Sequence, residues 1–158
     1  MIKPGDKLDT NLSLKAVVNG EQTDCALADL LKRRTILSIY MKNNTRGCDL
    51  QTHALAEAAG DFDKLGWDII AVSKDTCGSH LKYAQKQGIG FTLVSDPEYK
   101  ITGAADAVIE KSMYGRKYMG PARCAILVEA DGTVLGVIEK IDTKAHDEEL
   151  KTLINEIG

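Results

Sequence analysis

The chain has 158 residues, of which 44% are apolar and 27% are charged, and its formal net charge is −3. This composition is ordinary for a globular protein with a hydrophobic core, and it excludes low-complexity and repeat classes. The small negative charge, without a basic stripe, gives no general attraction to nucleic acid or to anionic membranes. We therefore expect one domain over residues 1–158, with no nucleic-acid and no membrane partner.

The N-terminal residues Met1 to Asp6 lack the apolar segment of a secretory signal. No apolar run approaches the roughly 20 residues that a membrane span needs, so we expect a cytoplasmic protein. The cysteines form no C-x-x-C pair and no cluster with zinc-finger spacing, so we expect free or redox-active thiols, no metal and no cofactor. The four are Cys25, Cys48, Cys77 and Cys124.

The predicted elements alternate between strands and helices along most of the chain. Asn19-Gly20 and Asp131-Gly132 are dipeptides that favour tight hairpin turns, and Gly66 and Gly88 follow helices as C-terminal stops. In chain order we expect strands at 11–18 and 21–25, a helix at 26–33, a strand at 35–41, a helix at 48–65, a strand at 67–73, a helix at about 76–87, a strand at 91–94, a helix at 98–106, strands at 123–130 and 133–139, and a helix at 146–157.

This order predicts the α/β class. The central strands are joined through helices, which requires parallel neighbours with right-handed crossovers. The final hairpin makes the sheet mixed, and Ser95-Asp96-Pro97 is typical of the cap and first residue of a helix. The expected architecture is a central mixed β-sheet flanked by helices, with an N-terminal β-hairpin, which is compatible with a thioredoxin-like fold.

Two thiols follow buried strands, at the edge of the sheet where α/β proteins place their sites. Cys48 follows the strand at 35–41, and Cys77 follows the strand at 67–73. A thiol at a helix N-terminus faces unpaired N–H groups and the positive end of the dipole, and both favour the nucleophilic thiolate. Thr45 can orient a substrate oxygen through its hydroxyl. The alternative interpretation is that Cys48 is a small buried core residue.

Several segments resemble a known family. Asn44-Thr45-Arg46-Gly47-Cys48 resembles the active-site segment of peroxiredoxins, in which a threonine precedes the peroxidatic cysteine by three residues. Similar segments occur in the same order and at matching spacing. These are Pro4-Gly5-Asp6-Lys7-Leu8, Val72-Ser73-Lys74-Asp75, Leu93-Val94-Ser95-Asp96-Pro97 and the stretch from Glu110 to Gly120. The last is close to one typical of the peroxiredoxin Q subfamily, also called bacterioferritin comigratory protein.

The resemblance implies a thiol-dependent peroxidase. The Cys48 thiolate attacks a hydroperoxide and becomes a sulfenic acid, Thr45 holds the peroxide, and Arg123 lies beside the sulfur and stabilises charge on the breaking O–O bond. The implied partners are hydrogen peroxide or organic hydroperoxides as substrates, and thioredoxin or another thiol as reductant. The chain is expected to be a monomer or a weak dimer.

Three residues depart from the family sequence. Met41 stands where the family usually has proline, Asp49 where it has threonine or serine, and Gln51 where it has glutamate. These changes leave open a low-turnover peroxide sensor or a chaperone-like redox protein on the same fold. A thiol–disulfide oxidoreductase is disfavoured because C-x-x-C is absent.

The resemblance also bears on the thiol that resolves the sulfenic acid. Some members place it five residues after the first cysteine, where this chain has His53. Others place it in the helix after the next strand, so the hypothesis is a Cys48–Cys77 disulfide. Cys124 is the rival, although its strand position favours a core thiol. Without an internal partner, an external thiol reduces Cys48.

Two groups of side chains are expected to be structural. We expect His53, His80 and His146 on helix surfaces. We expect Met113, Tyr114, Tyr118 and Met119 to fill gaps in the core rather than to line a surface.

Overall fold

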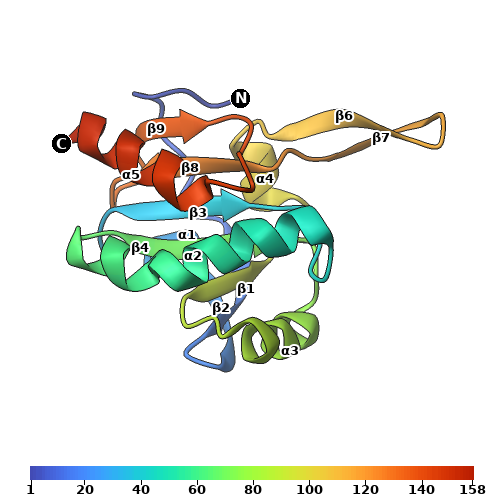
Figure 1. Cartoon of the computed structure of the whole chain (residues 1–158), viewed down its shortest axis with the longest axis horizontal. Coiled ribbons are helices and arrows are strands. Elements are labelled where there is room, and N and C mark those ends of the chain that lie inside the picture. Colours follow the sequence, from blue (N-terminus) through green and yellow to red (C-terminus); the bar gives the residue numbers. More distant parts are fainter.

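The computed structural model describes residues 1–158 and contains one large mixed sheet covered by helices on both faces (Figure 1). The sheet has seven strands in the order β2-β1-β5-β4-β3-β8-β9. The three central strands β3, β4 and β5 are parallel, and the outer neighbours β1 and β8 join antiparallel. The strands are β1 (Ser13–Val18), β2 (Glu21–Ala26), β3 (Thr35–Ile39), β4 (Asp68–Ser73), β5 (Thr92–Ser95), β8 (Cys124–Val128) and β9 (Val134–Ile138).

The helices divide between the two faces of this sheet. The first face is covered by α2 and α5, which pack with β3, β4 and β8, while α3 covers the same face over β1 and β5. The opposite face buries the larger cluster, which includes residues of α1 and α4. The helices are α1 (Leu27–Leu30), α2 (Arg46–Lys64), α3 (Cys77–Gln87), α4 (Lys100–Ala104) and α5 (His146–Ile157). None combines the length and apolar composition that a bilayer crossing requires.

The predicted fold class is confirmed. The turn and helix-stop residues identified in the sequence adopt the backbone conformations that these positions require. Asn19 and Gly20 both have positive φ, 52° and 80°, as the tight turn between β1 and β2 requires. Gly88 ends α3 in the left-handed conformation, with φ 67°. Gly132 has φ 92°, and a Cβ there would lie 2.7 Å from the carbonyl oxygen of Leu8, so only glycine fits.

The predicted start of α4 is wrong. Pro97 lies in a turn instead of at the first helical position, and the helix begins at Lys100. Asp96 nevertheless caps the N-terminus of α4, although it lies four residues before the first helical residue. Its carboxylate accepts hydrogen bonds from the backbone N–H groups of Lys100 at 2.7 Å and Thr102 at 3.2 Å.

A second, two-stranded sheet was not predicted. Strands β6 (Val108–Met113) and β7 (Arg116–Pro121) pair antiparallel and project from the body of the protein (Figure 1). Its exposure overturns the expectation of core packing here, because the exposed fractions are 52% for Met113, 97% for Tyr114 and 60% for Met119. Both faces of such a ribbon meet solvent, so no apolar alternation marks its strands.

Candidate active site

Cys48 occupies the first turn of α2, directly after the loop that leaves β3. It is the third residue of the helix, so it lies among backbone N–H groups that have no intrahelical partner. The residue is 3% exposed, and its thiol is not part of a disulfide. The unpaired N–H groups and the helix dipole favour negative charge at this position.

Thr45 precedes the helix and presents a free acceptor. Its backbone is extended, as at an N-cap, but its side chain makes no capping hydrogen bond. The hydroxyl instead donates to the carbonyl oxygen of Lys42 at 2.8 Å. Because this bond uses the hydroxyl proton, the lone pairs of the oxygen remain available to accept from another donor.

Arg123 lies against the residue next to Cys48. A Cβ built on Gly47 would be 1.9 Å from Nη1 and 3.2 Å from Cζ of Arg123. The guanidinium group therefore fills the space that any side chain at position 47 would need. Arg123 directly precedes β8, and the next residue, Cys124, packs into the cluster on the opposite face of the sheet. The contact depends on Gly47, which the sequence analysis did not single out as a site residue.

A buried asparagine ties the active-site loop to α3. Asn43 is 2% exposed, and its backbone N–H donates to the carboxylate of Asp75 at 2.9 Å. Its Nδ2 donates to Oγ of Ser79 at 3.1 Å and lies 3.2 Å from Nδ1 of His80. Its Oδ1 accepts from the hydroxyl of Tyr40. The loop before Cys48 and the first turn of α3 are thus held by one polar network, which no local sequence signal indicated.

Two of the departures from the family sequence have defined roles. The carboxylate of Asp49 accepts the hydroxyl proton of Tyr83 at 2.7 Å, which links α2 to α3. Gln51 is fully buried, and its Nε2 donates to Oγ of Ser38 at 2.7 Å and to the carbonyl oxygen of Ile39 at 3.2 Å. Gln51 therefore fastens the first turns of α2 to β3.

Cys77 is the first residue of α3 and shares a buried apolar cluster with Cys48. It is 6% exposed, and burial raises the pKa of its thiol, against a smaller opposing effect of Lys15. Thr76 caps the helix by accepting from the backbone N–H of Ser79 at 3.1 Å. The structure thus brings the two predicted thiols into one buried cluster.

The other cysteines differ from this pair. Cys124 is fully buried in the core, and burial raises the pKa of its thiol to about 12, which confirms the interpretation as a core thiol. Cys25 is partly exposed on β2. Burial, together with Asp29 and Asp24, raises the pKa of Cys25 as well. Neither environment favours a reactive thiolate.

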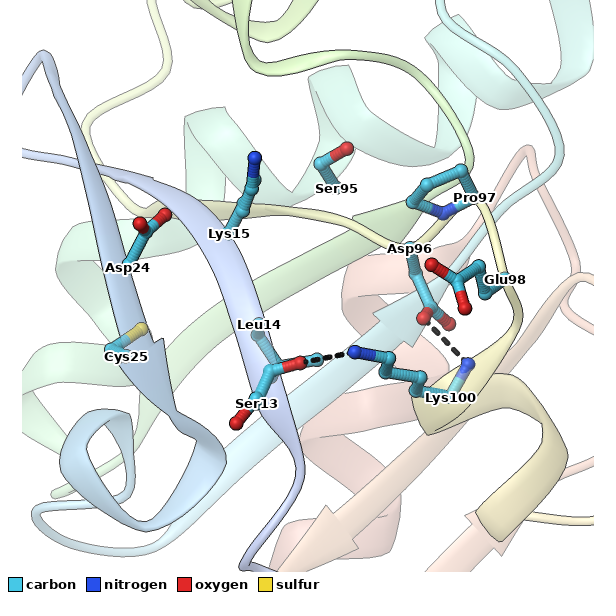
Figure 2. Close-up of a pocket in the computed structure, with 10 residues that line it drawn as sticks. All are labelled: Ser13, Leu14, Lys15, Asp24, Cys25, Ser95, Asp96, Pro97, Glu98 and Lys100. Atoms are coloured by element: carbon cyan, nitrogen blue, oxygen red, sulfur yellow. Dashed lines mark hydrogen bonds between the residues drawn. The ribbon is translucent and has the colours of Figure 1, made fainter.

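A hollow of about 630 Å³ lies at the edge formed by β1, β2 and the residues after β5. Cys25 is one of the residues that line it (Figure 2). None of the predicted site residues lines it. Two of its polar side chains are engaged within the protein, since the ammonium of Lys100 donates to the carbonyl oxygen of Ser13 at 3.0 Å and Asp96 accepts from the backbone N–H of Lys100. Because Cys48, Thr45, Arg123 and Cys77 are absent from its lining, the hollow is not part of the candidate active site.

Lys111 is a site residue that the sequence analysis quoted without assigning it a role. It extends from β6, and its Nζ lies 3.6 Å from Sδ of Met41 in the active-site loop. Burial and then Arg123 lower the pKa of Lys111, while Cys48 acts in the opposite direction. A second cation therefore lies within electrostatic reach of Cys48.

The surface placement expected for the histidines is wrong for two of them. His80 and His146 are fully buried, and burial lowers the pKa of both. Each finds polar partners, since Nε2 of His80 lies 3.0 Å from the carbonyl oxygen of Val94 and Nδ1 of His146 lies 2.8 Å from Glu149. Only His53 is exposed, as expected. No group of three His, Cys, Asp or Glu side chains converges as a metal site.

Comparison with known proteins identifies the family. The AhpC/TSA family profile matches residues 5–137. Peroxiredoxin Bcp of Xanthomonas campestris is 33% identical over 111 residues, which cover 70% of this chain and 69% of that protein. Peroxiredoxin Bcp of Escherichia coli K12 is 30% identical over 128 residues, which cover 81% of each chain.

A solved structure supports the same assignment. It is a trapped complex of the Xanthomonas campestris bacterioferritin comigratory protein, described for its alkyl peroxide reduction activity. It matches with a TM-score of 0.86 and 27% identity, covering 98% of this chain and 99% of that one. The thioredoxin-like fold and the family resemblance are therefore confirmed. The chain belongs to the AhpC/TSA family and is a peroxiredoxin of the Bcp type, a thiol-dependent peroxidase.

Proposed function

We propose that Cys48 is the peroxidatic nucleophile, with Thr45 and Arg123 as its partners on the substrate. The Cys48 thiolate attacks the distal oxygen of the hydroperoxide, the O–O bond breaks, and a sulfenic acid forms. Thr45 accepts the hydroxyl proton of the peroxide in a hydrogen bond, which orients the distal oxygen. Arg123 stabilises the negative charge that develops on the leaving oxygen. The observation that carries this proposal is the position of the Arg123 guanidinium, which packs directly against Gly47, the residue before Cys48.

Cys77 is the proposed resolving thiol. It attacks the sulfenic sulfur of Cys48, and the new disulfide forms with release of water. The shared buried cluster of the two thiols supports this assignment. The first turns of α2 and α3 are held by hydrogen bonds from Tyr83 to Asp49 and from Asn43 to Ser79. We expect these turns to loosen when the disulfide forms. The disulfide is then reduced by thioredoxin or another thiol.

The proposed substrates are hydrogen peroxide and organic hydroperoxides. The related Xanthomonas campestris protein is described for alkyl peroxide reduction, which supports the organic substrates. We place the activity in the cytoplasm, where reducing systems maintain free thiols such as the four in this chain. The protein is proposed to act as a monomer or a weak dimer.

The first experiment treats the fully reduced protein with one equivalent of hydrogen peroxide, traps free thiols and maps the cysteines by mass spectrometry. A Cys48–Cys77 bridge is expected. In Cys77→Ser, the same treatment leaves a sulfenic acid on Cys48, whereas Cys25→Ser behaves as the wild type. A bridge to Cys124 would remove Cys77 from the mechanism, and an unmodified Cys48 would refute the proposal.

Steady-state turnover separates a peroxidase from a peroxide sensor that reacts once. With thioredoxin and its reductase present, the wild type is expected to consume hydroperoxide continuously. Cys48→Ser is expected to lose this turnover by at least about 1,000-fold, since it removes the nucleophile. Rapid oxidation of Cys48 without continuous turnover would favour the sensor.

A further inference from the structure

Lys111 is held over the active-site loop by its own hairpin. Its stem passes above Gly120, where an added Cβ would lie 3.5 Å from Cδ of Lys111 and 3.3 Å from the ring of Tyr118. Tyr118 is also its partner across the two strands. The absence of a side chain at Gly120 gives the lysine a path, and the path ends with Nζ 3.6 Å from Sδ of Met41.

The ammonium group of Lys111 has no carboxylate partner. Its neighbour on the hairpin, Lys117, contrasts with it, because Lys117 pairs with Glu110 at 3.5 Å on the exposed part of the ribbon. Lys111 instead contacts the thioether of Met41, a neutral and weak acceptor. Met41 therefore holds the ammonium in place without supplying the counter-charge that would stabilise it.

Two of the three charged or titratable neighbours of Lys111, Arg123 and Cys48, belong to the proposed active site, and the third is the core thiol Cys124. Burial is the main cause that lowers the pKa of Lys111, and Arg123 adds to it, while Cys48 and Cys124 oppose. A lysine in this setting is a stronger acid than an exposed lysine. It transfers a proton more readily to a strong base formed beside it.

The peroxidatic step forms such a base. When the thiolate attacks the distal oxygen, the other oxygen leaves as an alkoxide or hydroxide and needs a proton. Arg123 stabilises charge, but a guanidinium does not release its proton in proteins. The hydroxyls of Tyr40 and Tyr83 already donate to Asn43 and Asp49, and burial raises the pKa of both phenols.

We propose that Lys111 is a further catalytic residue of this peroxidase, the proton donor to the leaving oxygen of the hydroperoxide. In the step, the sulfur of Cys48 gives two electrons and bonds to the distal oxygen, which keeps its hydrogen. The O–O bond breaks, and the leaving oxygen takes one proton from the Lys111 ammonium and departs as an alcohol or as water. The neutral amine then regains a proton from solvent. This inference rests on the proposed role of Cys48.

The test compares two oxidants with different leaving groups. tert-Butyl hydroperoxide releases an alkoxide that needs a proton, whereas peracetic acid releases acetate, which is stable without one. The rate of sulfenic acid formation on Cys48 is measured by rapid mixing in the Cys77→Ser background. Lys111→Met is expected to slow the reaction with tert-butyl hydroperoxide about 100-fold and to change the reaction with peracetic acid less than about threefold.

Two further variants separate proton donation from simple charge. Lys111→Arg keeps the positive charge but gives no proton, so it is expected to remain slow with tert-butyl hydroperoxide. Lys117→Met removes a cation from the same hairpin and is expected to match the parent with both oxidants. The peracetic acid rate also shows that each variant retains a folded active site.

Three results would overturn the inference. Equal slowing with both oxidants in Lys111→Met would reduce Lys111 to a general cation, as would full rescue by Lys111→Arg. An unchanged rate with tert-butyl hydroperoxide would remove Lys111 from the reaction. If the parent protein itself forms no sulfenic acid on Cys48, the proposed function fails as well, and that result is distinct from a failure confined to the Lys111 variants.

Discussion

The junctions that carry Cys48 and Cys77 share one backbone design and differ in their surroundings. Each follows a buried parallel strand, β3 or β4, and each places a cysteine in the first turn of a helix. Near Cys48 lie Arg123, which directly precedes β8, and Lys111, which belongs to β6. Around Cys77 burial dominates and raises the pKa of the thiol.

If Cys48 is the peroxidatic thiol, as we propose, a helix N-terminus alone does not make a thiol peroxidatic. Both cysteines face unpaired N–H groups, so this feature cannot distinguish them. What distinguishes them is Arg123, whose guanidinium lies against Gly47 beside Cys48, whereas the cation that acts on Cys77, Lys15, has a smaller effect than burial. In the proposed mechanism, tertiary contacts therefore decide which thiol is the nucleophile, and the most direct test is to remove those contacts one at a time.

The largest effect is expected from Arg123→Met, which makes the first junction more like the second. Loss of one preorganised charge donor is expected to slow sulfenic acid formation on Cys48 about 100-fold. Rapid mixing with hydrogen peroxide measures this rate. Arg116→Met, on the exposed part of the hairpin, is the control and is expected to leave the rate unchanged. A rate near that of the wild type would show that Arg123 is a bystander.

The pH dependence of Cys48–Cys77 disulfide formation tests the proposed role of Cys77 as the attacking thiol. Because burial raises the pKa of Cys77, only a small fraction is thiolate at neutral pH. That fraction, and with it the rate of closure, is expected to rise about tenfold for each pH unit between about pH 6 and about pH 8. Quenched-flow mass spectrometry follows the bridge directly. A flat profile over this range would contradict attack by the Cys77 thiolate.

Matched glycine substitutions compare the two junctions. Gly47→Ala places a Cβ 1.9 Å from Nη1 of Arg123, whereas Gly78→Ala in α3 meets only Oγ1 of Thr76 at 3.8 Å. Displacement of the guanidinium is expected to slow sulfenic acid formation about tenfold in Gly47→Ala, which corresponds to about 1.4 kcal/mol. Gly78→Ala is expected to have no effect on this rate. Similar rates in the two variants would mean that Arg123 works equally well from another position.

The smallest effect is expected from Tyr83→Phe, which releases the link between the two junctions. The hydroxyl of Tyr83 donates to Asp49, and a hydrogen bond of this kind contributes about 1 kcal/mol. Its loss is expected to speed closure of the Cys48–Cys77 bridge about fivefold, since both first turns open more easily. Tyr114→Phe, at the exposed tip of the hairpin, is the control. Slower closure would show that Tyr83 guides the two thiols together.

Much of the fold could be predicted because its signals are local. Turn dipeptides, apolar runs and helix-stopping glycines marked β1, β2, β3, β4, β8 and β9 within a few residues. The β6–β7 hairpin was missed because its turn is Tyr114-Gly115, with φ 53° and 76°, and tyrosine is an unusual residue for this conformation. Its strands also lack a buried face, so the alternation that marks other strands is absent.

The site was only partly predictable, for a related reason. Cys48, Thr45 and Cys77 could be selected from their positions and from the family resemblance, whereas the burial of His80 depends on Asn43 and Val94, which are distant in sequence. The contact of Lys111 with Met41 joins a missed hairpin to a loop, and no local signal predicts such a pair. The charged and polar groups around Cys48 come from segments that are distant in sequence, so their contacts are seen only in the folded structure.

The separation of the β6–β7 ribbon from the main sheet has a consequence for how this enzyme changes over time. The ribbon shares no strand pairing with the seven-stranded sheet, and a two-stranded hairpin contributes little stability of its own. Mutations along it are therefore expected to change folding stability little, and those that displace Lys111 alter the group that we propose as proton donor to the peroxide. Selection can in this way adjust the reactivity of Cys48 toward new oxidants while the core sequence drifts under separate constraints.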